Sequence, residues 1–165
     1  MALAIRKFPD PILKRPTRPI QRLDAPLAKL IEQMVATMRA QNRCVGLAAP
    51  QVGSDLRLAV MDSSANPKAP PGNGLLVLVN PQIIESEGAS IQREGCLSIP
   101  DFTGNVKRAL KVRVRAADEF GSVRELWLSG FEAIIAQHEV DHLDGKLFLD
   151  RVGSWGMDVF KRKNY

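Results

Sequence analysis

The stretch "QHEVDHLDG", residues 137–145, contains both histidines of this chain, four residues apart, with Glu139 directly after the first. Apolar residues precede them at the spacing i, i+3, i+4, i+7, i+11, which is one face of a helix. The pattern predicts a helix that turns both imidazoles toward the interior. The positions on this face are Phe131, Ile134, Ile135, His138 and His142.

The ends of this helix have signals of their own. Ser129 with Glu132 three residues later has the form of a capping box, and Gly145 is placed as a C-terminal stop. We therefore expect the helix to lie between Ser129 and Gly145.

Two imidazoles four residues apart can bind one divalent metal ion, and Glu139 beside them is placed to move a proton on water. A hydrolytic site also needs a third protein ligand. The spacing mildly favours Cys96 over the other thiol, Cys44, and no histidine follows His142. The remaining candidates are the downstream carboxylates Asp144, Asp150 and Asp158, none of which lies in an HxxGxxH-type continuation.

The rest of the chain predicts an α+β fold. Asp24 and Pro26 begin an amphipathic helix, and a backbone-rich loop, "CVGLAAPQVG", follows it. Residues 62–74 form a second loop. "KVRVRA" and "VRELWL" alternate strictly on either side of a turn, which predicts an antiparallel hairpin. We expect antiparallel sheets packed around the helix in the C-terminal half that carries the HExxH motif.

Length and composition fit one compact domain over residues 1–165, because 45% of the residues are apolar and 25% are charged. No apolar run reaches the length of a membrane span, so we expect a soluble, cytoplasmic protein without a membrane partner. Two cysteines provide no disulfide framework. The net charge of +5 is spread along the chain as a solvated surface, and no DNA-recognition motif is present.

Three stretches together resemble the signature motifs of the peptide deformylase family, in that family's order: "VGLAAPQ" (45–51), "EGCLS" (94–98) and "QHEVDH" (137–142). The resemblance runs over nearly the whole chain. It implies a metal-dependent hydrolase that removes the N-formyl group from the N-terminal methionine of newly made polypeptides and releases formate.

The resemblance also implies roles for individual residues. Cys96, His138 and His142 would hold one divalent metal ion, usually ferrous iron, with zinc, nickel or cobalt able to substitute. Glu139 would be the acid/base, while Gln51 and the backbone N–H of Leu97 would face the formyl oxygen, where negative charge develops.

Substrate contacts follow from the same resemblance. Backbone at Gly46 and Gly95 would pair with the peptide as an added strand. The slot for the methionine side chain would be lined by Val45, Phe131, Ile134, Ile135 and the ring of His138. The expected partners are N-formylmethionyl nascent chains and, transiently, the ribosome. Plain core packing explains Phe131, Ile134 and Ile135 equally well.

Two positions depart from the family pattern. Cys44 stands where the first motif usually opens with glycine. It can be interpreted as a small buried residue, or as a second thiol near the site that is prone to oxidation. Thr103 stands where many members carry arginine, which leaves the contact to the peptide there open. The segment after "FLDRV" is short and predicts no long terminal helix.

Two other classes share some of these features. A zincin-type peptidase also carries HExxH but needs a third histidine or carboxylate after His142. A non-catalytic metal- or peptide-binding module would be marked by loss of Glu139 or Gln51, and both are present.

Overall fold

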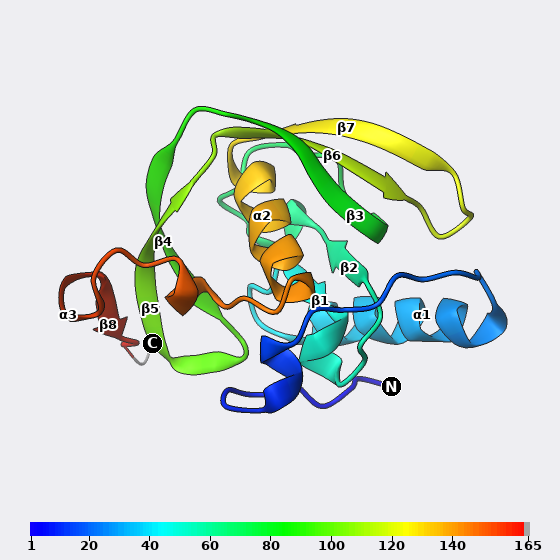
Figure 1. Ribbon diagram of the computed structural model, residues 1–165, viewed down its shortest axis with the longest axis horizontal. Coiled ribbons are helices and arrows are strands. Elements are labelled where there is room, and N and C mark those ends of the chain that lie inside the picture. The colour runs from blue at the N-terminus through cyan, green and yellow to red at the C-terminus, as the bar shows by residue number, and fades with distance from the viewer. Residues whose placement is uncertain (164–165) are drawn as a thin grey trace.

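The structure is a computed structural model that describes residues 1–163. It has an α+β fold, as predicted (Figure 1). The α-helices are α1 (Ala25–Ala40), α2 (Phe131–Leu143) and the short α3 (Trp155–Asp158). The 3-10 turns are η1 (Pro11–Lys14), η2 (Ala49–Val52), η3 (Ser63–Ala65) and η4 (Phe148–Asp150). The strands are β1 (Gly46–Ala48), β2 (Leu58–Met61), β3 (Leu76–Glu87), β4 (Ser90–Cys96), β5 (Ile99–Arg108), β6 (Lys111–Ala117), β7 (Val123–Ser129) and β8 (Val159–Lys161).

The strands form two antiparallel sheets. The larger has the order β1-β2-β3-β6-β7 and the smaller the order β4-β5-β8. The predicted hairpin is confirmed, because β6 pairs with β7 in unbroken register from Lys111 opposite Ser129 to Ala117 opposite Val123. β1 and β4 are each the edge strand of their sheet, so both keep one side free of a neighbouring strand.

Helix α1 packs against the larger sheet. The Asp24 carboxylate accepts a hydrogen bond from the Leu27 N–H at 3.0 Å, which fixes the start of the helix as predicted. Leu27, Met34 and Met38 are buried in one cluster with residues of β1, β2 and β3. The apolar face of α1 therefore closes one side of the core.

Helix α2 crosses the centre of the molecule, with α1 on one side and β6 and β7 on the other (Figure 1). The predicted stripe is only partly turned toward the core. Ile135 and His142 are buried, whereas Phe131, Ile134 and His138 are half-buried. Several polar residues of α2 are also buried, among them Glu139 and Asp141. A helix enclosed in this way can hold a polar site away from bulk water.

The capping box predicted for α2 is wrong. Ser129 is the last residue of β7, and Gly130 makes the turn into the helix with φ 59°, a conformation that glycine adopts readily. The Glu132 carboxylate binds Asn73 instead, accepting hydrogen bonds from its backbone N–H at 2.9 Å and its side-chain amide at 2.7 Å. The predicted stop at Gly145 is confirmed, with φ 77° directly after the helix cap.

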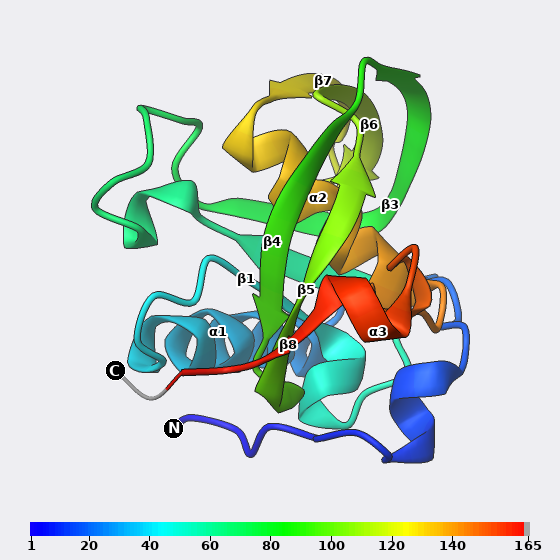
Figure 2. The same cartoon turned by 90° about the vertical axis from the view of Figure 1, so that its left-hand side faces the viewer.

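Two short strands differ from the expectations. Gly46–Ala48, expected as part of a loop, pairs with β2 as β1. β8 follows α2 in the chain and pairs with β5, so the short segment at the end of the chain extends the smaller sheet (Figure 2). The loop over residues 62–74 holds only the 3-10 turn η3. Within residues 1–163, no helix is both long and apolar enough to cross a membrane.

Candidate active site

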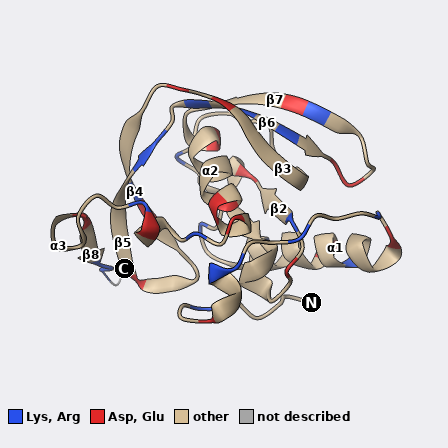
Figure 3. Cartoon of the chain, viewed as in Figure 1, with Lys and Arg blue, Asp and Glu red and all other residues tan. Residues whose placement is uncertain are grey.

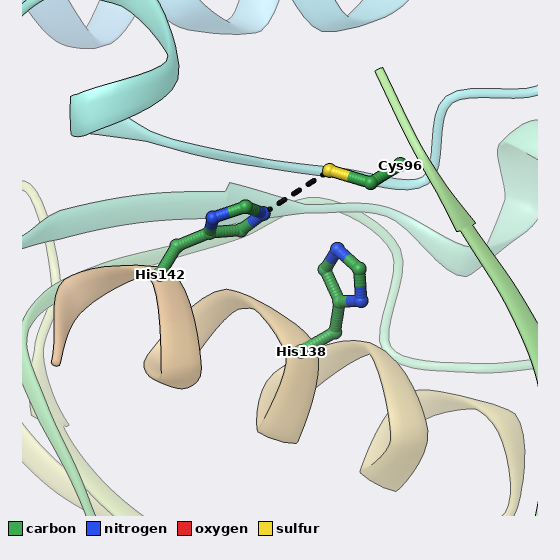
Figure 4. A group of neighbouring side chains, drawn as sticks. All are labelled: Cys96, His138 and His142. Atoms are coloured by element: carbon green, nitrogen blue, oxygen red, sulfur yellow. Dashed lines mark hydrogen bonds between the residues drawn. The ribbon is translucent and has the colours of Figure 1, made fainter. Parts of the chain in front are cut away.

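His138 and His142 project from one face of α2 toward Cys96, the last residue of β4 (Figure 4). The potential ligand atoms of these three residues all lie within 4.8 Å of one another. Cys96 Sγ lies 3.3 Å from His142 Nε2, and the two imidazole rings meet edge to face with centroids 4.9 Å apart. The structure thus brings together side chains from the second and third sequence motifs.

The donor set fits one divalent ion. Bonds to thiolate and imidazole are about 2.0–2.3 Å long, so the ligand atoms of a tetrahedral ion lie roughly 3.5 Å apart. Burial by itself raises the pKa of the Cys96 thiol, but His142 and His138 outweigh it and hold this pKa well below its usual value. The sulfur is therefore poised as the thiolate that metals bind.

The structure distinguishes the candidates for the third ligand. The Cys44 thiol donates a hydrogen bond to the Gly46 carbonyl at 3.1 Å and is not part of the cluster. Asp144 forms an ion pair with Arg57, and Asp150 forms one with Lys14. Cys96 is thus the candidate that completes the cluster, while a zincin-type set with a downstream carboxylate is absent from residues 1–163.

Glu139 is buried beside this cluster, with only 4% of its surface exposed. Burial raises its pKa, which makes this carboxylate a stronger proton acceptor than an exposed glutamate. Its Oε2 atom is buried without a hydrogen-bond partner in residues 1–163. This atom is therefore free to bind water or a reacting group.

Gly46 is the residue that lets Glu139 take this position. A β-carbon at Gly46 would lie 2.5 Å from Glu139 Oε1, which is closer than non-bonded atoms approach. We expect Gly46→Ala to displace the carboxylate and lower kcat/KM by about 100-fold, since an error of about 1 Å in a reacting group has that effect. Steady-state kinetics of the reaction at this site measure the loss. Gly156→Ala, where no atom lies within 4 Å, is the matched control, and equal rates for the two variants would contradict the argument.

Gln51 is buried next to the cluster. Its side-chain carbonyl accepts a hydrogen bond from the Ala48 N–H at 2.9 Å, and its amide group donates to Cys96 Sγ at 3.4 Å and Ser98 Oγ at 3.2 Å. The amide donor therefore lies against Cys96, at the edge of the cluster. Leu97 follows Cys96 in the turn between β4 and β5 and lines the same cleft.

A buried network behind His138 was not foreseen from the sequence. Glu94 Oε1 lies 2.8 Å from His138 Nδ1, and Arg108 donates to both Glu94 oxygens at 2.7 and 2.8 Å. Arg108 also donates to Asp141 at 2.6 Å, and Arg151 binds the same carboxylate. Burial would raise the pKa of Glu94, but Arg108 and His138 hold it at about 2. The ionised Glu94 orients the His138 ring so that Nε2 faces the cluster.

We expect Arg108→Met to destabilise the protein by about 3–5 kcal/mol, because the carboxylates of Glu94 and Asp141 would remain buried without their cation. Arg108 is 4% exposed. Urea denaturation measures the loss. Arg115→Met is the control, since its ion pair with Glu125 is exposed and worth at most about 1 kcal/mol. Similar losses in the two variants would mean that the network does not stabilise the fold.

The cluster lies at the base of a cleft of about 1350 Å³. β1 forms one wall and β4 another, and α2 forms the floor. A more apolar hollow of about 590 Å³ lies along α1, and its lining contains neither histidine nor cysteine. The cleft therefore belongs to the metal cluster, and the predicted site residues among its lining are Val45, Gly46, Gln51, Gly95, Cys96, Leu97, Phe131, Ile134, Ile135, His138 and Glu139.

The two departures from the family pattern also lie at this cleft. Cys44 is 8% exposed and packs in the same core cluster as Leu47 and Val60. Burial, with the nearby charge of Glu139, raises the pKa of its thiol to about 12, which keeps it neutral and poorly reactive. Thr103 on β5 pairs with Gly95 on β4.

Two imidazoles and a thiolate, with a buried carboxylate beside them and an open cleft above, define a metal-dependent hydrolase. Comparison with known proteins identifies its kind, because residues 2–157 match the family described as Polypeptide deformylase. The chain belongs to the polypeptide deformylase family. Its activity is removal of the N-formyl group from nascent peptides.

Individual relatives cover almost the whole chain. A peptide deformylase of Thermodesulfovibrio yellowstonii is 42% identical over 161 residues, which are 98% of this chain and 95% of the relative. One of Halothermothrix orenii is 45% identical over 95% of this chain and 97% of its own length. The crystal structure of peptide deformylase from Thermotoga maritima superposes with a TM-score of 0.85 at 37% identity, covering 93% of this chain and 99% of that one.

Proposed function

We propose that residues 1–165 form one catalytic domain that removes the formyl group from the N-terminal methionine of new polypeptides, with iron(II) held by Cys96, His138 and His142. The observation that carries the proposal is the cluster of these three ligands at the base of the cleft, with Cys96 and His142 buried and His138 half-buried. A divalent ion bound there supplies the Lewis acidity that makes water nucleophilic near neutral pH.

Glu139 is the acid/base of this reaction. It takes a proton from the attacking water and returns it to the amine nitrogen as the bond from that nitrogen to the formyl carbon breaks. Its buried position supports the role, because burial raises its pKa toward the pH at which the enzyme works. Formate and a free amino terminus are the products.

Gln51 and the backbone N–H of Leu97 stabilise the charge that develops on the formyl oxygen. The side-chain carbonyl of Gln51 accepts a hydrogen bond from the Ala48 N–H, which fixes the side chain, and its amide group, which donates to Cys96 and Ser98, lies next to the cluster. One such donor is typically worth about 3 kcal/mol of activation free energy.

The peptide binds between the two edge strands. The free sides of β1 and β4 lie in the same cleft, so backbone at Gly46 and Gly95 is available to pair with an extended peptide. The methionine side chain enters the slot formed by Val45, Phe131, Ile134, Ile135 and the ring of His138. A crystal structure of a peptide deformylase from Acinetobacter baumannii with Met-Ala-Ser bound superposes with a TM-score of 0.85 at 38% identity, which supports a peptide in this cleft.

The proposed place of action is the cytoplasm, where nascent chains emerge, with transient contact to the ribosome. Among the possible metals, iron is proposed and zinc, nickel or cobalt can take the same ligands, because thiolate and imidazole suit all of them. The metal content of protein purified without oxygen and without added metal tests this choice. Zinc in place of iron would overturn it.

The substrate is tested by comparing three peptides on iron-loaded protein: formyl-Met-Ala-Ser, acetyl-Met-Ala-Ser and formyl-Gly-Ala-Ser. We expect rapid formate release from the first and no hydrolysis of the second. Release from the third should be slow, because glycine has no side chain to fill the slot. If folded, metal-loaded protein hydrolyses none of them, the proposed substrate is wrong.

A further inference from the structure

The cleft wall carries positive charge that the reaction does not use. Both acidic residues that line the cleft, Glu94 and Glu139, are buried near the cluster. Five basic residues also line the cleft, three of them at positions 161–163, in and directly after β8 (Figure 3). They are Arg43, Arg93, Lys161, Arg162 and Lys163.

Arg162 lies beside Gly95, where the peptide is proposed to pair. Its backbone N–H donates to the Asp101 carbonyl at 2.8 Å, which anchors it at the end of β8. Its guanidinium lies over Gly95, because a β-carbon at Gly95 would collide with it. The same point is 3.5 Å from the methyl group of Thr103. The guanidinium thus occupies the space that the missing side chain of Gly95 leaves open.

The sheet register explains how residues so far apart in sequence meet. Gly95 on β4 pairs with Thr103 on β5, and Thr103 pairs with Phe160 on β8 (Figure 2). The side chains of directly paired residues lie on the same face of a sheet. Along one strand, side chains two residues apart also lie on the same face. Arg162 follows Phe160 by two residues and therefore lies on the face of Gly95.

The neighbouring arginine is already engaged. The Arg93 guanidinium stacks over the Phe160 ring at 3.7 Å from its centroid, and its Nε donates to Asn105 at 3.0 Å. In contrast, no ion pair within residues 1–163 involves Arg162, and this residue is exposed. Within the described part of the chain, Arg162 is thus the cation next to Gly95 that is available to a ligand.

A peptide strand placed on the free edge of β4 brings one of its own residues opposite Gly95. The side chain of that residue lies on the same face as the Arg162 guanidinium. A carboxylate there gains a charge-assisted hydrogen bond, and an ammonium group is repelled. Since Gly95 is adjacent to the ligand Cys96, this residue closely follows the formylated methionine.

We propose that Arg162 is a specificity residue that favours peptides with a carboxylate shortly after the formylmethionine. The inference rests on the proposed function, because it assumes that the peptide pairs with β4. The carboxylate can come from an Asp or Glu side chain, or from the terminus of a short peptide.

The test compares kcat/KM for amidated peptides of the form formyl-Met-X-Y-amide, with Glu, Ala or Lys at X or at Y, and formyl-Met-Ala-Ser as acid and as amide. For wild type we expect a preference for Glu over Lys of about fivefold or more at one of the two positions, expressed in KM, as for a partly exposed ion pair. The ratio of kcat/KM for formyl-Met-Ala-Ser as acid to that for its amide shows whether the terminus of the peptide, rather than a side chain, can supply the carboxylate.

Two variants assign the preference to Arg162. In Arg162→Gln, the ratio of kcat/KM for the Glu peptide to that for the Lys peptide should fall to about the Ala-to-Lys ratio of the same variant. Arg162→Lys keeps the positive charge and should retain part of the preference for Glu. Arg22→Gln, which removes an exposed arginine outside the cleft, should leave the wild-type ratio unchanged. That control excludes an effect of net charge.

An active wild type without preference for Glu overturns the role of Arg162 and leaves the proposed function intact. So does an Arg162→Gln protein that keeps the full preference. A metal-loaded wild type that releases formate from none of these peptides removes the proposed function, and this inference with it.

Discussion

Replacing Glu139 by Gln is expected to lower kcat for formate release by about 10²–10⁴-fold, the usual contribution of a positioned acid/base. The amide has nearly the same shape but cannot accept the proton of the attacking water. The metal should remain bound, because Cys96, His138 and His142 are unchanged. Steady-state formate release, with metal content measured on the same sample, tests both statements.

Glu132→Gln is the matched control on the same helix. Glu132 is also buried, but it binds Asn73 and is not part of the cleft lining. We expect this variant to keep a rate close to that of wild type. If Glu139→Gln retained most of the activity, another group would have to move the proton.

Cys96→Ala is expected to abolish stoichiometric metal binding and, with it, the activity. Two imidazoles without the thiolate leave the ion with too few protein ligands. The loss of affinity should exceed the roughly 10–100-fold that removal of an outer hydrogen-bond partner costs. Equilibrium dialysis against metal measures the affinity. The same variant separates this enzyme from a zincin-type peptidase, which would keep its metal through a downstream carboxylate.

Cys44→Ala is the control for the other thiol of the chain. Its Sγ atom bonds to the Gly46 carbonyl and lies outside the ligand cluster, so we expect the metal to stay. Retention of metal by Cys96→Ala, or its loss from Cys44→Ala, would contradict the assignment of Cys96.

Local patterns were sufficient to predict much of the fold. Strict alternation in residues 111–116 and 123–128, on either side of a turn, predicted the hairpin, and Asp24 with the apolar spacing after it predicted α1. The start of α2 was misjudged because Ser129 and Glu132 have the right spacing for a capping box, while their partners are set by tertiary structure. Ser129 pairs across the sheet with Lys111, and Glu132 binds Asn73 on a loop distant in sequence.

In the site, too, residues with a local pattern could be predicted, whereas contacts set by tertiary structure could not. The motif residues could be recognised because metal binding restricts residue type and spacing. The network of Glu94, Arg108, Asp141 and Arg151 could not, since it joins β4, β5, α2 and the segment after η4. The positions of Glu94 and Asp141 inside the motifs were the available signal. Arg162 looked like one more surface charge, because nothing in the sequence indicates that β8 joins β5 and brings it to Gly95.

The most direct test of the account is an anaerobic titration of metal-free wild-type protein with iron(II), with formate release from formyl-Met-Ala-Ser followed at each addition. We expect no release without metal, a rate that rises linearly with iron, and a plateau at one iron per chain, the capacity of the cluster formed by Cys96, His138 and His142. Formate release that is independent of added iron, or a folded and fully loaded protein that releases none, would contradict the central claim.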